Sequence, residues 1–232
     1  MKTPPTLTVS AETGAILFDL DGTLADTDPL HAQAWQEVVK SHFGITFTWP
    51  DYYQACIIEG QSPTDFLLNL GADVRAQGLN REKAAIFRGL LRSHTLAQGV
   101  AEFLTLATEA GITLAIVSSG SRSSVNAFLS TIWPGTPPAV TISRDETFHH
   151  KPDPEPYLLA LTKLDRKPAA CIAIEDTARG IESARCAGLR SILISADAGS
   201  SQYGADLMIS SLRELTLLRL PQGEWTIQKT RI

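Results

Sequence analysis

The sequence predicts an α/β protein in which a small helical domain is inserted into a parallel sheet. Three observations support this: short apolar runs typical of buried strands, helical patterns between the later runs, and a long interruption after the first run. The runs are continuous rather than alternating, as expected of parallel strands that are covered on both faces. They are Ala15–Phe18, Ile112–Val117, Cys171–Ile174 and Ser191–Ile194.

Helical patterns accompany the later strands. They span Ser123–Thr131, Glu155–Lys163 and Ala178–Ala187, and Gly188 stands where the last of them should end. Regular alternation of strand and helix indicates a parallel sheet, because each crossover helix returns the chain to begin the next strand in the same direction.

The segment after the first strand breaks this alternation. Asp19 and Ser118 are much further apart in the sequence than one crossover helix requires. The helical patterns between them run from Asp28, as N-cap before Pro29, to Gly44, then from Pro63 to Leu70 and from Arg81 to Leu96. We therefore expect residues 26–98 to form a helical domain at the carboxyl end of the first strand, where open α/β sheets bind ligands. Residues 1–25 and 99–232 would form the core.

Composition and charge exclude several classes of function. With 20 Lys+Arg against 25 Asp+Glu the net charge is −5, so no basic surface is expected for nucleic acid or an anionic membrane. Residues 1–11 contain two prolines and lack the apolar run of a signal peptide, which predicts a cytoplasmic protein. We expect a monomer or weak homo-oligomer, and a loose tail over Pro221–Ile232.

Two carboxylates follow the first predicted strand, in Asp19-Leu-Asp21-Gly-Thr23. Residues i and i+2 of an extended chain can point the same way. Beside a metal and a phosphoryl group, one carboxylate can act as nucleophile and the next can deliver a proton to the leaving oxygen. An Asp-Gly turn that closes a hairpin fits this fragment equally well.

Two later segments could hold a phosphate. Ser118, Ser119 and the following residues place a hydroxyl and successive backbone N–H groups at a strand end, although such loops are often only N-caps. Lys151, in a proline-rich entry to a helix, could supply a fixed positive charge, or it could be a solvated loop lysine.

Glu175 and Asp176 place two more carboxylates at the end of the third predicted strand. A simple N-cap at Asp176 or Thr177 would explain one residue but not Glu175 beside it. Together with Asp19 and Asp21 they would repel one another and take up protons unless a cation were bound. We therefore expect a divalent metal, and oxygen ligands favour Mg²⁺ over Zn²⁺.

Taken in order, these segments resemble the four motifs of the haloacid dehalogenase superfamily of phosphohydrolases. The matching residues are Asp19-Leu-Asp21-Gly-Thr23, Ser118, Lys151-Pro152 and Glu175-Asp176. The insert resembles the cap of the beta-phosphoglucomutase-like sugar phosphatases and mutases, through the segments 28–35 and 60–65. The resemblance implies a Rossmann-like parallel sheet core with an inserted helical cap.

The resemblance also implies a role for each matching residue. Asp19 would be a nucleophile that forms an aspartyl-phosphate, and Asp21 the general acid and base. Ser118 and the Ser119 backbone would hold the phosphoryl oxygens, and Lys151 would orient the nucleophile. Asp19, Asp176 and the backbone carbonyl of Asp21 would bind Mg²⁺, with Glu175 binding it directly or through water.

In the predicted cap, His31 and Lys83 are the candidates for substrate contact. Alternatively, His31 could pack on Trp35, and Lys83 could lie on a solvated helix face. Related mutases resemble one another in an arginine that holds the second phosphate of the substrate, where this chain has Pro63. Lys83 or Arg88 could take over that contact.

These features predict a Mg²⁺-dependent phosphatase that acts on a small phosphorylated metabolite, most simply a sugar monophosphate. A sugar phosphomutase with the same nucleophile is the alternative. A signalling receiver also combines acidic residues, Mg²⁺, a hydroxyl and a lysine on a parallel sheet, but it has no need of a cap. A phosphate-binding protein without catalysis is the remaining class.

Overall fold

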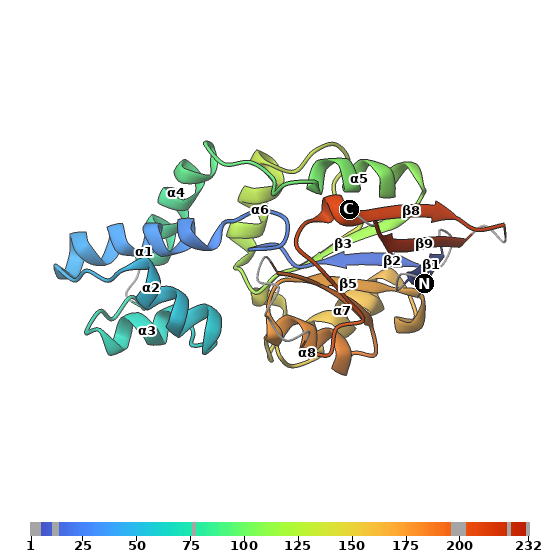
Figure 1. Ribbon diagram of the computed structural model, residues 1–232. Helices are drawn as coiled ribbons and strands as arrows, with labels where there is room; N and C mark the ends of the chain where they lie inside the picture. Colours follow the sequence, from blue (N-terminus) through green and yellow to red (C-terminus); the bar gives the residue numbers. More distant parts are fainter. Residues whose placement is uncertain (1–5, 11–13, 76–77, 196–202, 222–223, 231–232) are drawn as a thin grey trace.

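A computed structural model describes residues 6–10, 14–75, 78–195, 203–221 and 224–230. Its main sheet has six parallel strands in the order β4-β3-β2-β5-β6-β7 (Figure 1). The strands are β2 (Ala15–Phe18), β3 (Thr113–Val117), β4 (Val140–Ile142), β5 (Ile172–Glu175), β6 (Arg190–Ile194) and β7 (Leu207–Ile209). The predicted parallel α/β sheet is confirmed, with β2 near its centre between β3 and β5.

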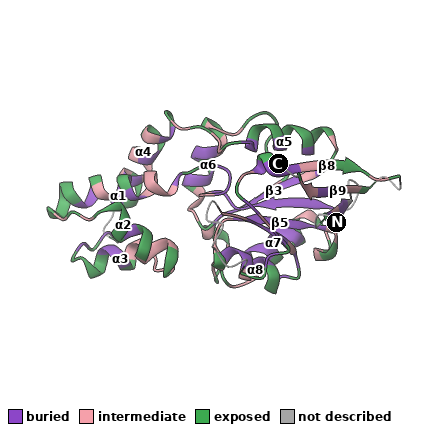
Figure 2. Cartoon of the chain, in the orientation of Figure 1, coloured by how far each residue is buried: buried purple, intermediate pink, exposed green. Residues whose placement is uncertain are grey.

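Helices cover both faces of this sheet. α5 (Val100–Glu109) and α6 (Arg122–Thr131) pack on one face, and α7 (Glu155–Leu164) and α8 (Ala178–Cys186) on the other. Strand β2 shows why the apolar runs are continuous. Its residues Ile16 and Phe18 belong to the cluster on the α5 side, whereas Ala15 and Leu17 belong to the cluster on the α7 side. The main strands are accordingly buried throughout most of their length (Figure 2).

A second sheet lies beside the main sheet, on the right in Figure 1. It is antiparallel, in the order β1 (Thr6–Ser10), β9 (Glu224–Lys229) and β8 (Leu215–Arg219). The expectation of a loose tail over Pro221–Ile232 is therefore wrong for β9, which pairs with two strands and buries Ile227. Residues 222–223 and 231–232 of that tail lie outside the described part of the chain.

The inserted helices form a lobe beside the main sheet (Figure 1). They are α1 (Asp28–Phe43), α2 (Trp49–Tyr52) with a π-helical turn at Tyr53–Ile58, α3 (Pro63–Asn69) and α4 (Leu79–Leu91). The lobe has its own hydrophobic core, which includes Trp35, Tyr52, Phe66 and Leu67. Pro29 suits the first turn of α1, and Gly44 ends it in the left-handed conformation.

Two predicted helix ends in this lobe are wrong. The N-cap of α1 is Thr27 rather than Asp28, and α4 ends at Leu91 instead of continuing to Leu96. Beyond α4 the chain returns to the core, and the N–H of Ala97 donates to the carbonyl of Leu24. The outgoing and returning connections therefore lie side by side. No helix in the described segments is long and apolar enough to cross a membrane.

Candidate active site

The carboxyl ends of three adjacent strands bring the predicted motifs together. The N–H of Asp19 donates to the carbonyl of Ile174 at 2.9 Å, and the N–H of Ser118 donates to that of Ile142 at the same distance. Both residues therefore continue the sheet hydrogen bonding beyond the strands. Glu175 is the last residue of β5, next to β2. Sheet pairing thus fixes the backbones of these residues at one edge.

Lys151 is buried among acceptors at this edge. Its Nζ lies 2.5 Å from Oδ1 of Asp19, 2.6 Å from Oε1 of Glu175 and 2.7 Å from the carbonyl of Val117. Only 5% of the residue is exposed, so the alternative of a solvated loop lysine is wrong. Burial lowers the pKa of Lys151, but the two carboxylates outweigh it and hold that pKa above its usual value. Lys151 is therefore a fixed cation.

Glu175 points toward Lys151 and the core behind it. Its Oε1 also accepts a hydrogen bond from the hydroxyl of Tyr157 at 2.5 Å. Its Oε2 is buried without a hydrogen bond among the described residues. Gly180 makes room for this carboxylate, because a Cβ there would lie 1.9 Å from Oε2. The sequence interpretation missed Tyr157 and Gly180, since neither spacing nor residue type marks their contact with Glu175.

Three carboxylates at this edge could hold a metal ion. Oxygens of Asp19, Glu175 and Asp176 lie within 4.8 Å of one another. Burial and the neighbouring carboxylates raise the pKa of Asp176, and burial does the same for Asp19 although Lys151 opposes it. A cation would relieve this repulsion, and an all-oxygen donor set suits Mg²⁺. Gly22, with φ of 80°, lets Asp176 approach the turn that follows Asp21.

The inserted lobe reaches Asp21. Oδ1 of this carboxylate accepts from the Thr27 hydroxyl at 2.5 Å and lies 3.2 Å from Nε2 of His31. Nδ1 of His31 contacts Nζ of Lys83. The His31 ring stacks on Phe87 with centroids 4.0 Å apart, so packing on Phe87 replaces the expected packing on Trp35. Thr27 was missed by the sequence interpretation, which assigned the helix cap to the next residue.

The contacts among Asp21, His31 and Lys83 determine which of these groups carry a proton. Burial raises the pKa of Asp21, but His31, Thr27 and Lys83 outweigh it and lower that pKa. Burial lowers the pKa of Lys83 to about 8 and, with Lys83 adding to the effect, lowers that of His31. An ionised Asp21 can only accept, so Nε2 of neutral His31 donates to it and Nδ1 accepts from Lys83. Lys83 is 9% exposed, so the solvated-face alternative is wrong.

The loop after β3 provides groups suited to phosphate. Oγ of Ser118 accepts from the N–H of Gly120 at 2.9 Å and lies 3.5 Å from Oδ2 of Asp21. The N-cap of α6 is Ser121, whose hydroxyl accepts from the N–H of Ser124. Ser121 therefore caps helix α6, whereas Ser118 and Ser119 lie at the edge of the sheet.

A cavity of about 600 Å³ lies between the sheet edge and the inserted lobe. From the core it is lined by acidic, basic and hydroxyl side chains, and from the lobe by a mixture of polar and aromatic ones. The lining includes Asp19, Asp21, Ser119, Lys151, Asp176, Asp28, His31, Tyr52 and Lys83. This volume and polarity suit a small, polar, charged ligand.

Asp28 in this cavity makes stability depend on pH. Burial, with Asp21 and Asp26 adding to it, raises its pKa from 3.8 to about 8. A carboxyl whose pKa is higher in the folded state stabilises the fold below the unfolded pKa, and this contribution is lost as pH rises toward the folded pKa. We expect Asp28→Asn to be more stable than wild type at pH 8, by on the order of 2 kcal/mol because the carboxyl is only partly buried, but not at pH 4.

Urea unfolding in chelator across that pH range would test this expectation. Glu37→Gln is the matched control, since Glu37 lies exposed on the same helix. A stability difference for Asp28→Asn that did not grow with pH would contradict the raised pKa.

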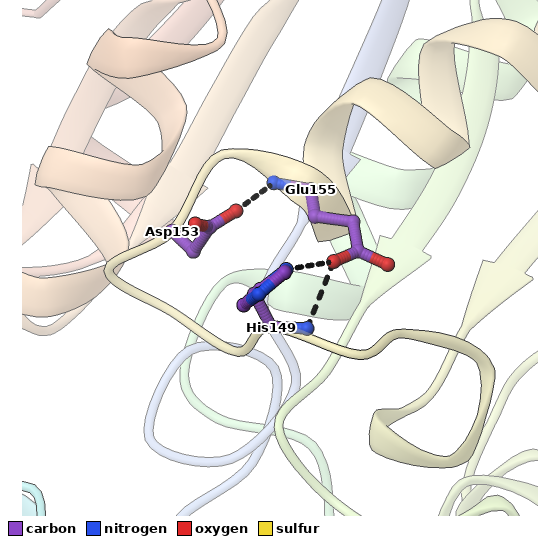
Figure 3. A group of neighbouring side chains, drawn as sticks. All are labelled: His149, Asp153 and Glu155. Atoms are coloured by element: carbon purple, nitrogen blue, oxygen red, sulfur yellow. Dashed lines mark hydrogen bonds and ion pairs between the residues drawn. The ribbon is translucent and has the colours of Figure 1, made fainter.

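A second group of potential metal ligands is explained by local structure. Figure 3 shows His149, Asp153 and Glu155 at the start of α7. Glu155 accepts from the N–H and Nδ1 of His149, and Asp153 accepts from the N–H of Glu155 at 2.9 Å. These bonds stabilise the segment that contains Lys151, and we assign no metal site to this group.

Comparison with known proteins identifies relatives along most of the chain. A family model described as haloacid dehalogenase-like hydrolase matches residues 16–194. Protein CbbY of Rhodobacter capsulatus is 33% identical over 227 residues, which cover 91% of this chain and 99% of that protein. Hexitol phosphatase A of Escherichia coli (strain K12) is 32% identical over 220 residues, covering 91% and 97%. A solved CbbY variant from Rhodobacter sphaeroides, in complex with xylulose-(1,5)bisphosphate, is 28% identical with a TM-score of 0.75, covering 88% and 96%.

Proposed function

The chain belongs to the haloacid dehalogenase-like hydrolases, and we propose that it is a Mg²⁺-dependent phosphatase that hydrolyses a phosphorylated sugar through an aspartyl-phosphate. The proposal rests above all on one observation: Asp19 is held by Lys151 at the edge of a cavity in which Asp21 is held by the inserted lobe. Relatives named as sugar phosphatases support the substrate class.

In the proposed mechanism an oxygen of Asp19 attacks phosphorus and displaces the sugar oxygen. Lys151 orients this carboxylate, and the Ser118 hydroxyl with the Ser119 backbone holds the phosphoryl oxygens. Mg²⁺, held by Asp19, Asp176 and the carbonyl of Asp21, would neutralise charge on those oxygens. The negative charge of the bound phosphate favours the protonated form of Asp21, which gives that proton to the leaving oxygen and then accepts one from the water that hydrolyses the acyl phosphate. Glu175 binds Lys151 and supports the site from behind.

We propose that residues 26–98 act as the cap that encloses the substrate, with His31 and Lys83 beside it. Excluding bulk water strengthens the electrostatic contacts in the cavity. Because enclosure would serve no purpose in a receiver, the cap favours an enzyme. Phosphorylated sugars do not cross membranes unaided, so we propose a cytoplasmic enzyme. We further propose that it acts as a monomer or weak homo-oligomer.

The cavity favours a phosphatase over a mutase. Pro63 lines it where related mutases carry an arginine. Of the two residues that could replace that arginine, Arg88 is exposed on α4 away from the cavity lining, and Lys83 already uses one of its three N–H donors on His31. Without that arginine the cap has weaker means of holding the second phosphate of a bisphosphate intermediate while the intermediate reorients.

The test is phosphate release from a panel of sugar monophosphates and an aryl phosphate, with Mg²⁺ and with chelator, over many turnovers. We expect metal-dependent release of many phosphates per enzyme molecule. Isomerised sugar phosphate without phosphate release would identify a mutase, and uptake of one phosphoryl group per molecule a receiver. Absence of all three would contradict catalysis.

Asp21→Asn tests proton transfer separately from the nucleophile. We expect turnover of sugar phosphates to fall about a hundredfold or more, and that of an aryl phosphate much less, because a basic departing oxygen needs the proton most. Steady-state kcat on the two substrate types would show the difference. Equal losses on both would assign Asp21 a structural role.

A further inference from the structure

The basic side chains of the cavity differ in whether they have partners. Among the described residues, four lysine and arginine side chains line the cavity: Lys83, Arg144, Lys151 and Arg179. Lys151 contacts two carboxylates, Lys83 contacts His31, and Arg179 donates to the carbonyl of Lys151. Among the described residues, the Arg144 guanidinium makes no hydrogen bond, ion pair or ring contact. An arginine of intermediate burial that lines a ligand cavity without such a partner is suited to binding an anion.

The backbone of Arg144 is fixed relative to the phosphate-binding loop. Arg144 begins a 3₁₀ turn after β4, and its N–H donates to the carbonyl of Gly120 at 2.9 Å. Gly120 in turn donates to the Ser118 hydroxyl. One backbone hydrogen bond therefore connects Arg144 to the loop that holds the reacting phosphoryl group.

The acidic neighbours of Arg144 in the sequence are occupied elsewhere. Asp145 accepts the backbone N–H of Arg122 at 2.8 Å, and Glu146 accepts the guanidinium of the same arginine. Glu146 also accepts from the backbone and hydroxyl of Ser143. Both carboxylates thus bind Arg122, and neither pairs with the Arg144 guanidinium, although Asp145 also lines the cavity.

The charge of Arg144 acts on groups from both sides of the cavity. Burial lowers the pKa of His150, and Arg144 lowers it further. In the lobe, burial raises the pKa of Tyr52 while Arg144 opposes the rise. Both of these residues also line the cavity, so the charge of Arg144 lies within electrostatic reach of its core side and its lobe side.

We propose that Arg144 binds a second anionic group of the substrate, so that the enzyme prefers phosphorylated sugars that carry another phosphate or a carboxylate. Lys151 and the loop after β3 take the reacting phosphoryl group, and Arg144 takes the group that the reaction leaves unchanged. This anion site lies on the core, in contrast to the cap position at which Pro63 stands. The role rests on the proposed phosphatase activity and specifies its substrate class.

Kinetics on matched substrates test this role. For a pentose and a hexose, kcat/KM would be measured on the sugar monophosphate, the bisphosphate and the phosphorylated sugar acid, with p-nitrophenyl phosphate as a reference. The enzymes would be wild type, Arg144→Met, Arg144→Lys and the control Arg88→Met, which removes an exposed arginine.

We expect wild type to favour at least one of the two anionic classes over the matched monophosphate by about tenfold or more. Arg144→Met should remove that preference, chiefly through KM, and Arg144→Lys should restore part of it. Preference for the bisphosphate would identify a phosphate as the second group, and preference for the sugar acid a carboxylate. The control should keep the wild-type preference.

Three results would overturn the role of Arg144. The first is a wild type that prefers neither anionic class over the monophosphate. The other two are an Arg144→Met variant whose kcat/KM falls equally on all sugar phosphates, or one whose kcat/KM falls on none of them. Failure of the phosphatase proposal looks different, because p-nitrophenyl phosphate would then also remain intact. Calorimetric binding of the bisphosphate and the sugar acid to Asp19→Asn, with and without Arg144→Met, measures the contact independently of turnover. Equal affinities in the two proteins would contradict it.

Discussion

Asp19→Asn lowers phosphate release by at least about a thousandfold, which is the largest effect that we expect from one substitution. The side-chain amide is a poor nucleophile and cannot form the acyl phosphate. The fold should persist, because a neutral side chain removes the repulsion between Asp19 and its neighbours Glu175 and Asp21. In the wild type, burial and this repulsion both raise the pKa of Asp19. Lys151 keeps its contacts with Glu175 and the Val117 carbonyl.

Turnover of an aryl phosphate, with circular dichroism and thermal unfolding of the same samples, would measure both effects. Asp73→Asn is a suitable control, because Asp73 is exposed in the inserted lobe and pairs with Arg75. Substantial activity of pure Asp19→Asn would rule out Asp19 as the nucleophile. Loss of folding would leave the rate uninformative, and Asp19→Ser would then provide a smaller neutral replacement.

Lys151→Met is expected to reduce both activity and stability. Removing one partner of a buried ion pair typically costs about 3–5 kcal/mol, since the remaining charge stays buried without compensation. Here two carboxylates, those of Asp19 and Glu175, lose their cation. Catalysis should fall as well, because nothing then orients Asp19 against the phosphoryl group.

The stability loss of Lys151→Met should depend on pH. The pKa of Asp19 is already raised in the wild type, and loss of the cation raises it further. The folded variant therefore keeps a proton that folded wild type releases, and its deficit relative to wild type grows as pH rises above the pKa of Asp19 in folded wild type.

Urea unfolding in chelator at pH 5 and pH 8 would measure this deficit. Lys163→Met, which removes an exposed lysine paired with Glu146 at 3.3 Å, should change stability by less than about 0.5 kcal/mol. A deficit that shrank as pH rose would contradict the ion-pair explanation.

Local sequence patterns were sufficient for four of the six strands of the main sheet, β2, β3, β5 and β6, and for the helices α6, α7 and α8, whereas β4, β7 and α5 were not recognised. Strands such as β2 contribute side chains to a core on each face, so each residue of the run must be apolar, and the pattern is visible without knowledge of the neighbours. Strand β9 was not recognised, because the stability of an isolated short strand depends on its partners β1 and β8. Helix ends depended on the same longer-range contacts, as the Ala97–Leu24 bond after α4 illustrates.

The sequence by itself determined which chemical groups meet at the sheet edge, because parallel strands place their carboxyl ends together. Only the tertiary structure decided what each group contacts. Glu175 turned toward Lys151 and Tyr157, His31 connected Lys83 to Asp21, and the Arg144 side chain has no partner among the described residues. Each of these outcomes depends on side chains that are distant in sequence and share a buried space. Burial and charge pairing in that space are properties of the packed molecule, which no local pattern of residues encodes.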